Sequence, residues 1–371
     1  MQANNSKTRN GALDVYKFGY CLLIAVFHLY KLAQAGELPK HLPLGSIGVE
    51  FFVLSAGIFF YAGFERVGGG GDLTAYPLQY IKKRFMRFFP FTTVGFLWAA
   101  GVNRIFIYTA RGGELSFQRL FKWFSADIWE ITLIKMNGMN NGVSFVNDAA
   151  WTISSMLIVE FFILCILVRS KKNFVTFICP MSIIMGYGIW RHLENGGPYD
   201  WMWVTAFGTF RVYLLMCCAY FCYELSKKIK EMRYTKAGRI VLTVAEFCGY
   251  LLTLYIAEFY TSRNCKWLAT LIFVLVLAIT ISCKSYSCDI FRDSKMTRFL
   301  GELSLGVYLG HFPVGQLLVY FYPNPDEFLA QKWLYLACVL VAGYLVIVLA
   351  KLMIKGATVL NSGLRKILVE E

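Results

Sequence analysis

The sequence predicts an all-α integral membrane protein, a bundle of about ten transmembrane helices with both termini in the cytoplasm. Hydrophobic residues make up 57% of the chain and charged residues only 16%, whereas soluble domains carry about 25% charged residues. The apolar residues occur in runs of about 20, the length needed to span a bilayer. Basic residues gather on alternate connections between these runs, as they do in cytoplasmic loops.

Each apolar run predicts one spanning helix. In chain order the ten runs are Asp14–Leu32, Leu44–Phe64, Phe89–Tyr108, Ala150–Val168, Phe174–His192, Trp201–Leu225, Ile240–Tyr260, Trp267–Cys283, Phe299–Tyr322 and Trp333–Ile354. A basic amphipathic stretch, Tyr76–Phe88, leads into the third helix. Thr109–Ala149 is polar at both ends with a semi-apolar middle, Phe117–Ile134, and we expect an interfacial or re-entrant element there.

The distribution of basic residues predicts the orientation. With the N-terminus inside, cytoplasmic segments hold 23 of the 37 Lys and Arg residues, and the opposite side holds 10. Because Lys and Arg accumulate in cytoplasmic loops, this bias favours ten helices in the cytoplasmic membrane, and nine or eleven would scramble it. The net charge of +14 is then a property of these loops and of their contact with membrane lipids, and it does not indicate nucleic-acid binding.

The chain reads as a single transmembrane domain, 1–371. A polar cytoplasmic tail, 1–13, precedes the first helix without a small-residue cleavage site, so we expect no removable signal peptide. Gly68–Gly71 is interpreted as a flexible hinge, and no appended soluble domain is expected after the last helix. The 11 cysteines show no metal-type spacing and are interpreted mainly as small buried hydrophobes.

The first two helices carry ionisable residues at membrane depth, which are costly and therefore expected to be functional. Lys17 and His28 are eleven residues apart on one helix face, separated by roughly 16 Å along the axis. Glu50 lies at a similar depth to His28 on the next helix. A carboxylate beside an imidazole orients a general base, although such a pair could equally serve only to hold two helices together.

Other polar residues occupy the predicted spans. Glu160 and Arg211 reach mid-membrane, and pairing with each other is the expected arrangement. Ser304, Tyr308 and His311 lie on one helix face at i, i+4 and i+7. His311 could line a cavity or be a packing residue, and the spacing does not distinguish these alternatives.

The remaining histidines, His41 and His192, fall at the outer ends of helices and are interpreted as ordinary interfacial residues. Four scattered histidines without an HExxH pattern make a metal site improbable.

Basic residues also cluster at the cytoplasmic mouth of the third helix, in Lys82-Lys83-Arg84-Phe-Met-Arg87. Arg84 and Arg87 are one turn apart and point the same way. Arginine binds phosphate through a planar fork of donors, which favours a phosphate site. The alternative is a positive-inside flank that touches anionic lipid headgroups. The spacing alone leaves both interpretations open.

Taken in order, these blocks resemble the membrane-bound acyltransferase-3 family of O-acyltransferases. Four stretches carry the resemblance: the Lys17-to-His28 spacing in the first helix, Gly45–Gly57, Arg84–Pro90, and the later pair formed by Trp151-Thr152 with Glu160 and by Gly301–His311. Two departures stand out. Lys17 replaces the family's arginine and lacks its bidentate fork, and Ser55-Ala-Gly replaces a more usual Ser-Gly-aromatic.

The resemblance implies a reaction that uses cytoplasmic acyl-CoA, usually acetyl-CoA, as donor and acetylates a hydroxyl of a cell-surface polysaccharide or lipid-linked sugar. The CoA phosphates would bind at Lys17, Lys83, Arg84 and Arg87. His28, oriented by Glu50, would deprotonate the acceptor hydroxyl or accept the acyl group itself.

The later signatures of the family imply residues that contact the acceptor. The expected set is Trp151, Glu160, Arg211, Ser304, Tyr308 and His311. No metal is implied.

A polytopic transporter or exporter of a lipid-linked saccharide is the main alternative, since it also explains buried charges. The absence of paired inverted halves and the basic mouth beside the His28 helix favour the enzyme. An inactive relative that serves as a scaffold is a third possibility, suggested by Lys17.

Overall fold

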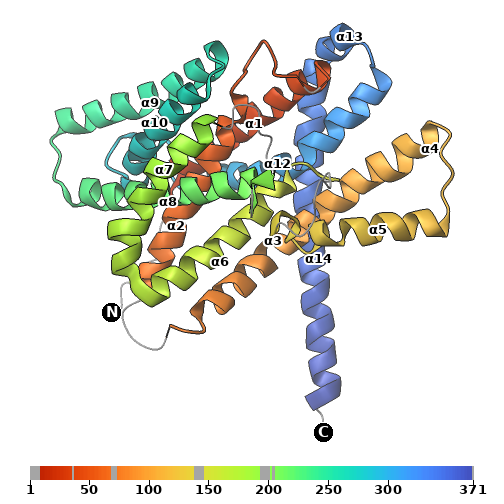
Figure 1. Cartoon of the computed structure of the whole chain (residues 1–371), viewed down its shortest axis with the longest axis horizontal. Coiled ribbons are helices and arrows are strands. Elements are labelled where there is room, and N and C mark those ends of the chain that lie inside the picture. The colour runs from red at the N-terminus through yellow and green to blue at the C-terminus, as the bar shows by residue number, and fades with distance from the viewer. Residues whose placement is uncertain are drawn as a thin grey trace.

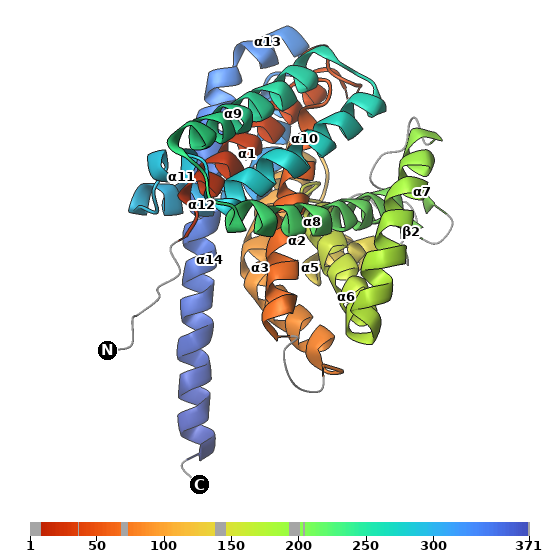
Figure 2. The same cartoon turned by 90° about the vertical axis from the view of Figure 1, so that its left-hand side faces the viewer.

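The computed structural model describes residues 9–35, 37–67, 73–137, 146–192, 201–202 and 205–369, and these residues form a bundle of long helices (Figures 1 and 2). The long helices are α1 (Gly11–Ala33), α2 (Gly48–Val67), α3 (Tyr76–Ala100), α6 (Ala150–Asn173), α7 (Cys179–His192), α8 (Phe207–Glu231), α9 (Lys236–Phe259), α10 (Arg263–Ser282), α12 (Lys295–Phe321) and α14 (Lys332–Val369). The predicted all-helical architecture is confirmed. The predicted Gly68–Gly71 hinge lies outside the described residues.

Short elements connect these helices. They are η1 (Gly45–Ile47), η2 (Gly101–Ile107), α4 (Tyr108–Ala110), α5 (Phe117–Ile131), η3 (Lys135–Asn137), η4 (Phe174–Ile178), α11 (Ser287–Ile290), α13 (Pro325–Ala330) and an antiparallel pair of two-residue strands, β1 (Trp201–Met202) and β2 (Thr205–Ala206). The segments η2 and η4 are π-helical turns, and such turns are frequent near functional sites.

Packing divides the bundle into two connected groups. One group joins α1 to α12 and α12 to α14, and in the other α8 packs against α2, α6 and α10, with α9 on the far side of α10. Figure 1 shows α9 and α10 at one side of the molecule and α14 extending past the other helices toward the C-terminus. We call the end where α1 begins the proximal end and the end where α1 terminates the distal end.

Among the described residues, seven segments are long and apolar enough to cross a membrane, which makes this a multi-pass membrane protein. One of them, Ala150–Trp190, contains both α6 and α7, and its backbone turns at Ser170, whose φ and ψ are −159° and 90°. The helices α8 and α12 are not among the seven, although both pack inside the bundle. The count of ten spans and the cytoplasmic termini stay predictions.

Several helices differ from the predicted bounds; α8, for example, begins at Phe207 and not at Trp201. The basic approach is continuous with the third predicted span, because α3 continues through Pro90 to Ala100 and η2 and α4 extend the helical backbone to Ala110. Proline removes only one amide donor, and near it the Thr92 hydroxyl donates to the Phe88 carbonyl at 3.0 Å. The last helix, predicted to end at Ile354, continues to Val369 because nothing after the apolar run breaks the helical backbone.

The long segment between α4 and α6 contains the amphipathic helix α5. Ser116 caps its N-terminus by accepting a hydrogen bond from the Arg119 amide at 3.3 Å. Its apolar face is exposed, with Phe117 83% and Phe121 63% accessible, while Glu130 on the opposite side is buried. This distribution suits a helix whose apolar side faces lipid at a membrane interface.

Two glycines let α12 and α14 approach closely. A Cβ atom at Gly306 would overlap the backbone of Gly343, and one at Gly343 would overlap Val307. Small residues at helix contacts permit this backbone approach in membrane proteins, where dispersion contacts drive helix association.

We therefore expect Gly306→Ala to separate these helices and to lower the thermal unfolding temperature of the detergent-purified protein. Overpacking of this kind costs typically 1–3 kcal/mol. Gly356→Ala is the matched control, because a Cβ atom there meets nothing within 4 Å. An equal unfolding temperature for the two variants would contradict the close approach.

Candidate active site

Two histidines meet near the distal end, where α1 contacts α12. The ring centroids of His28 and His311 are 5.1 Å apart. The Phe312 ring centroid lies 5.7 Å from that of His28, and the two rings are nearly perpendicular. His28 Nδ1 and His311 Nε2 are both buried and have no hydrogen-bond partner among the described residues. Buried polar atoms are normally satisfied, so two orphaned imidazole nitrogens side by side indicate a place where a ligand binds.

The tautomer of His311 follows from its other nitrogen. His311 Nδ1 lies 3.2 Å from the carbonyl oxygen of Val307, which can only accept, so Nδ1 carries the proton. The orphaned Nε2 is then a lone-pair acceptor. The pair can accept a proton or a hydrogen bond from a hydroxyl, which is the requirement of a general base.

Tyr308 extends this site toward α6. Its hydroxyl donates to Thr152 Oγ1 at 2.8 Å, and its ring lies 6.1 Å from that of His311 and 5.9 Å from that of Phe52. Ser304, two turns from His311, is buried and donates its hydroxyl to the Gly301 carbonyl at 2.8 Å. The structure therefore brings His311 to the His28 ring and Tyr308 to the His311 ring, and the Ser304 hydroxyl makes a hydrogen bond within its own helix.

A buried carboxylate that the sequence analysis did not single out holds the start of α6. Glu130 accepts hydrogen bonds from the backbone amides of Val146 and Asn147, each at 2.8 Å, and from Lys135 Nζ at 3.2 Å. Burial raises the pKa of Glu130, while the Lys135 ammonium opposes this shift. The Asn147 side chain in turn donates to the Leu309 carbonyl at 2.8 Å, between Tyr308 and His311 in the sequence.

Glu50 pairs with Arg211. The Arg211 guanidinium donates to Glu50 Oε1 from Nε at 2.8 Å and from Nη2 in a still closer contact. Lys266 Nζ lies 3.8 Å from the same oxygen and donates to Ser46 Oγ at 2.8 Å. Glu50 is fully buried, and its second oxygen, Oε2, has no hydrogen-bond partner. We call Glu50, Arg211 and Lys266 the distal charge cluster.

Two tryptophans contact Arg211 in this cluster. The Trp151 and Trp190 ring centroids lie 5.8 Å and 5.6 Å from the guanidinium carbon, within the range of cation–π attraction. Trp151 comes from the first turn of α6 and Trp190 from the last turn of α7, and both are buried. Arg211 is thus held by a carboxylate and by aromatic faces together.

The predicted His28–Glu50 pair is therefore wrong, as is the predicted pairing of Glu160 with Arg211. No ion pair joins His28 to Glu50 in the described structure, because α2 packs mainly on α8 and turns Glu50 toward Arg211. Sequence position fixes the depth of a residue in a span but does not fix the direction in which its side chain points.

Glu160 pairs instead with Arg84 near the proximal side. Arg84 donates to it in a bidentate geometry, from Nε at 3.0 Å and from Nη2 at 2.8 Å. Glu160 is fully buried, and the Phe88 ring covers the guanidinium with its centroid 4.9 Å from Cζ. Arg84 is thus committed to a protein carboxylate, whereas Arg87, one turn later, is exposed.

Uncompensated cations remain around this proximal mouth. Lys17 lies over the Phe59 ring at 5.3 Å and interacts electrostatically with Arg9, Arg84 and Arg87. Arg9 is paired with Asp14. Among the described residues, neither Lys17 nor Arg87 has an ion-pair partner, and the exposed Lys83 has none either. This mouth is therefore positively charged, with Arg87 and Lys83 exposed at it.

The peripheral histidines stand apart from these clusters. His41 is exposed at the distal end, where its Nδ1 lies 3.3 Å from Glu258 Oε1. The side chain of His192 lies outside the described residues.

The helical bundle, its buried charges and its adjacent histidines define a polytopic membrane protein built around an internal polar site. A family model described as an acyltransferase domain matches residues 10–352, and the chain belongs to the acyltransferase-3 family. It is a membrane acyltransferase. The comparison with curated proteins and the comparison with solved structures found no match.

The Arg84–Glu160 pair predicts a defined pattern of stabilities. Arg84→Met should strongly destabilise the protein, by about 3–5 kcal/mol, because it leaves a buried carboxylate without a partner. The double variant Arg84→Met/Glu160→Met should recover most of this loss. Thermal unfolding of the detergent-purified variants measures both effects, with Arg87→Met as the exposed control. A double variant as unstable as Arg84→Met alone would contradict the pair.

Proposed function

We propose that the protein acetylates a hydroxyl of an extracytoplasmic or lipid-linked saccharide in the cytoplasmic membrane, with cytoplasmic acetyl-CoA as donor. The observation that carries this proposal is the adjacent pair His28 and His311, each of which has one buried ring nitrogen without a partner among the described residues. The family supplies acyl transfer as the reaction class. The cationic mouth at Lys17 and Arg87 supports an anionic donor, since CoA carries several phosphates.

The proposed reaction needs one proton acceptor and one positioning group. The acceptor hydroxyl attacks the thioester carbonyl carbon and loses its proton to His28 as the new ester bond forms. The carbon–sulfur bond then breaks, and His28 returns the proton to the CoA sulfur, which leaves as a thiol. His311 Nε2 accepts a hydrogen bond from the bound substrate, and Tyr308 and Thr152 fix the α12 and α6 sides of the site.

Donor and acceptor would enter from opposite ends of the bundle. The CoA phosphates would bind at the proximal mouth, on Lys17 and Arg87, and the acyl end would extend along α1 toward His28. Lys17 and His28 lie on one face of α1, roughly 16 Å apart along its axis. In this arrangement Arg84 supports the mouth through its pair with Glu160 and contributes its charge, without a free fork for phosphate.

Replacement of His28 tests the catalytic role. His28→Gln should abolish acetyl transfer to a saccharide acceptor while binding of labelled acetyl-CoA is retained, because glutamine keeps the polar volume but cannot accept a proton. His41→Gln is the matched control, because the His41 side chain is exposed and lies beside Glu258 of α9. Full turnover by the His28 variant would remove this assignment.

The cationic mouth predicts a salt-dependent affinity. Lys17→Met and Arg87→Met should each weaken acetyl-CoA binding about tenfold at low ionic strength. The difference should be smaller at high salt, most clearly for the exposed Arg87, because salt screens exposed charges. Lys228→Met is the control, because Lys228 is an exposed lysine on another helix. Unchanged affinity in both mouth variants, measured with labelled acetyl-CoA, would leave these cations as contacts to lipid headgroups only.

A further inference from the structure

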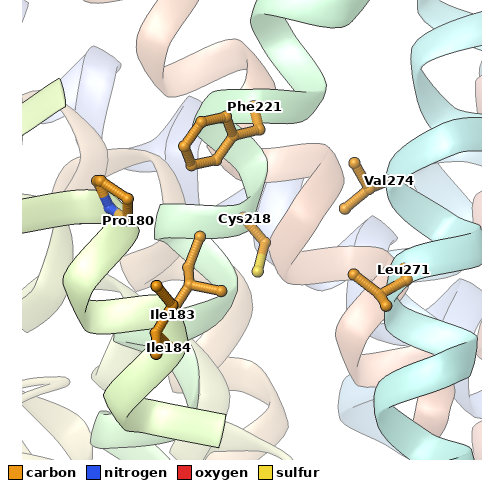
Figure 3. A pocket seen from close by; sticks show the side chains of 7 residues that line it. All are labelled: Pro180, Ile183, Ile184, Cys218, Phe221, Leu271 and Val274. Carbon is orange, nitrogen blue, oxygen red and sulfur yellow. The ribbon is translucent and has the colours of Figure 1, made fainter. Parts of the chain in front are cut away.

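An apolar groove with a volume of about 320 Å³ lies between α7, α8 and α10. In Figure 3 the groove residues of α7, including Ile184, and those of α10, including Leu271, flank the α8 residues Cys218 and Phe221. Ile184 is 68% exposed and Leu271 53% exposed, so the groove opens on the outer surface of the bundle. In a membrane protein this surface faces hydrocarbon, and the groove can hold one lipid chain.

The same helix faces lead from the groove to the distal charge cluster. On α10, Leu271 follows Trp267 by four residues, and on α8, Cys218 follows Arg211 by seven, so each pair shares a face. On α7 the groove residues precede Trp190 by about two turns. Seven helical residues span roughly 10 Å. The nearest groove residues, Cys218 and Leu271, therefore lie about 10 Å or less along their helix axes from Arg211 and Trp267.

Aromatic rings cover the junction between groove and cluster. The Trp190 and Trp267 ring centroids are 5.1 Å apart, and Tyr187 contacts the Trp267 ring at 5.5 Å. Tryptophan and tyrosine are typical of the depth at which lipid chains give way to headgroups. A lipid chain in the groove would place its headgroup at this junction.

The described residues at this junction carry an excess of positive charge. In their ion pairs Arg211 and Lys266 provide two cations against the single carboxylate of Glu50. The Trp267 indole is 5% exposed, and its Nε1–H, which can only donate, has no hydrogen-bond partner among the described residues. The second oxygen of Glu50 is also unpartnered. Phosphate oxygens can accept from the indole and from both cations, and a neutral headgroup would leave the excess charge uncompensated.

We propose that this groove and the distal charge cluster form the binding site for a lipid-linked acceptor, with its hydrocarbon chain in the groove and its phosphate at Arg211, Lys266 and Trp267. The inference rests on the proposed acyl transfer and specifies its acceptor as a saccharide carried on a lipid phosphate. Charge complementarity favours this occupant, because phosphate oxygens can accept from the Trp267 indole and from both cations while the hydrocarbon chain fills the apolar groove.

Binding of farnesyl phosphate and farnesol to the detergent-purified protein tests the proposal without any variant. The two probes share one hydrocarbon chain and differ only in the phosphate. The wild-type protein should bind labelled farnesyl phosphate at least about tenfold more tightly than farnesol. Equal affinities would overturn the proposal. Displacement of farnesyl phosphate by equimolar phosphatidylglycerol would also overturn it, because the site would then hold bulk lipid.

Two variants separate the headgroup from the chain. Lys266→Met should abolish the preference for the phosphate, and Ile184→Trp/Leu271→Trp should weaken the binding of both probes by filling the groove. Lys40→Met and Leu251→Trp are matched controls at exposed positions outside the site. Unchanged probe binding in both site variants would overturn the proposal.

Acetyl-CoA binding is measured in the same preparations and should stay unchanged in all four variants. Loss of acetyl-CoA binding in every preparation, the wild type included, would instead count against the proposed acyl transfer, while the comparison of the two farnesyl probes would still decide the lipid-phosphate site.

Discussion

Two buried arginine–glutamate pairs determine which charged groups of this bundle remain available to a substrate. Arg211 holds Glu50 between α8 and α2, and Arg84 holds Glu160 between α3 and α6. An unpaired charge in a low-dielectric interior is costly, so these carboxylates are committed to protein partners. Other buried polar atoms have no partner among the described residues, and they include two imidazole nitrogens where α1 meets α12 and the Trp267 indole nitrogen near Lys266.

This division of charge separates the paired charges of a membrane acyltransferase from its histidines. The histidine pair lies near the distal end among aromatic rings, and among the described residues no carboxylate forms an ion pair with His28 or His311. Glu130, through Val146 and Asn147, fixes the start of α6 against the middle of α12. The buried carboxylates therefore hold the helices in place, and the histidines carry the proposed proton transfer.

Much of the fold followed from the sequence, because runs of apolar residues specify helices whose existence depends little on tertiary context. The depth of His28, Glu50 and Arg211 could also be predicted. Their partners could not, since the direction of a side chain around its helix depends on which helices pack together. The buried role of Glu130 was missed because it lies in a segment of mixed polarity, although the apolar face formed by Phe117 and Phe121 on the same helix was a usable signal for an amphipathic helix with a buried polar side.

A structure of the protein with bound acetyl-CoA tests the central claim most directly. The account predicts the CoA phosphates beside Lys17 and Arg87, with the thioester carbon within contact distance of the His28 and His311 rings. A donor bound with its thioester remote from both rings, or with its phosphates at the distal charge cluster, would contradict the account.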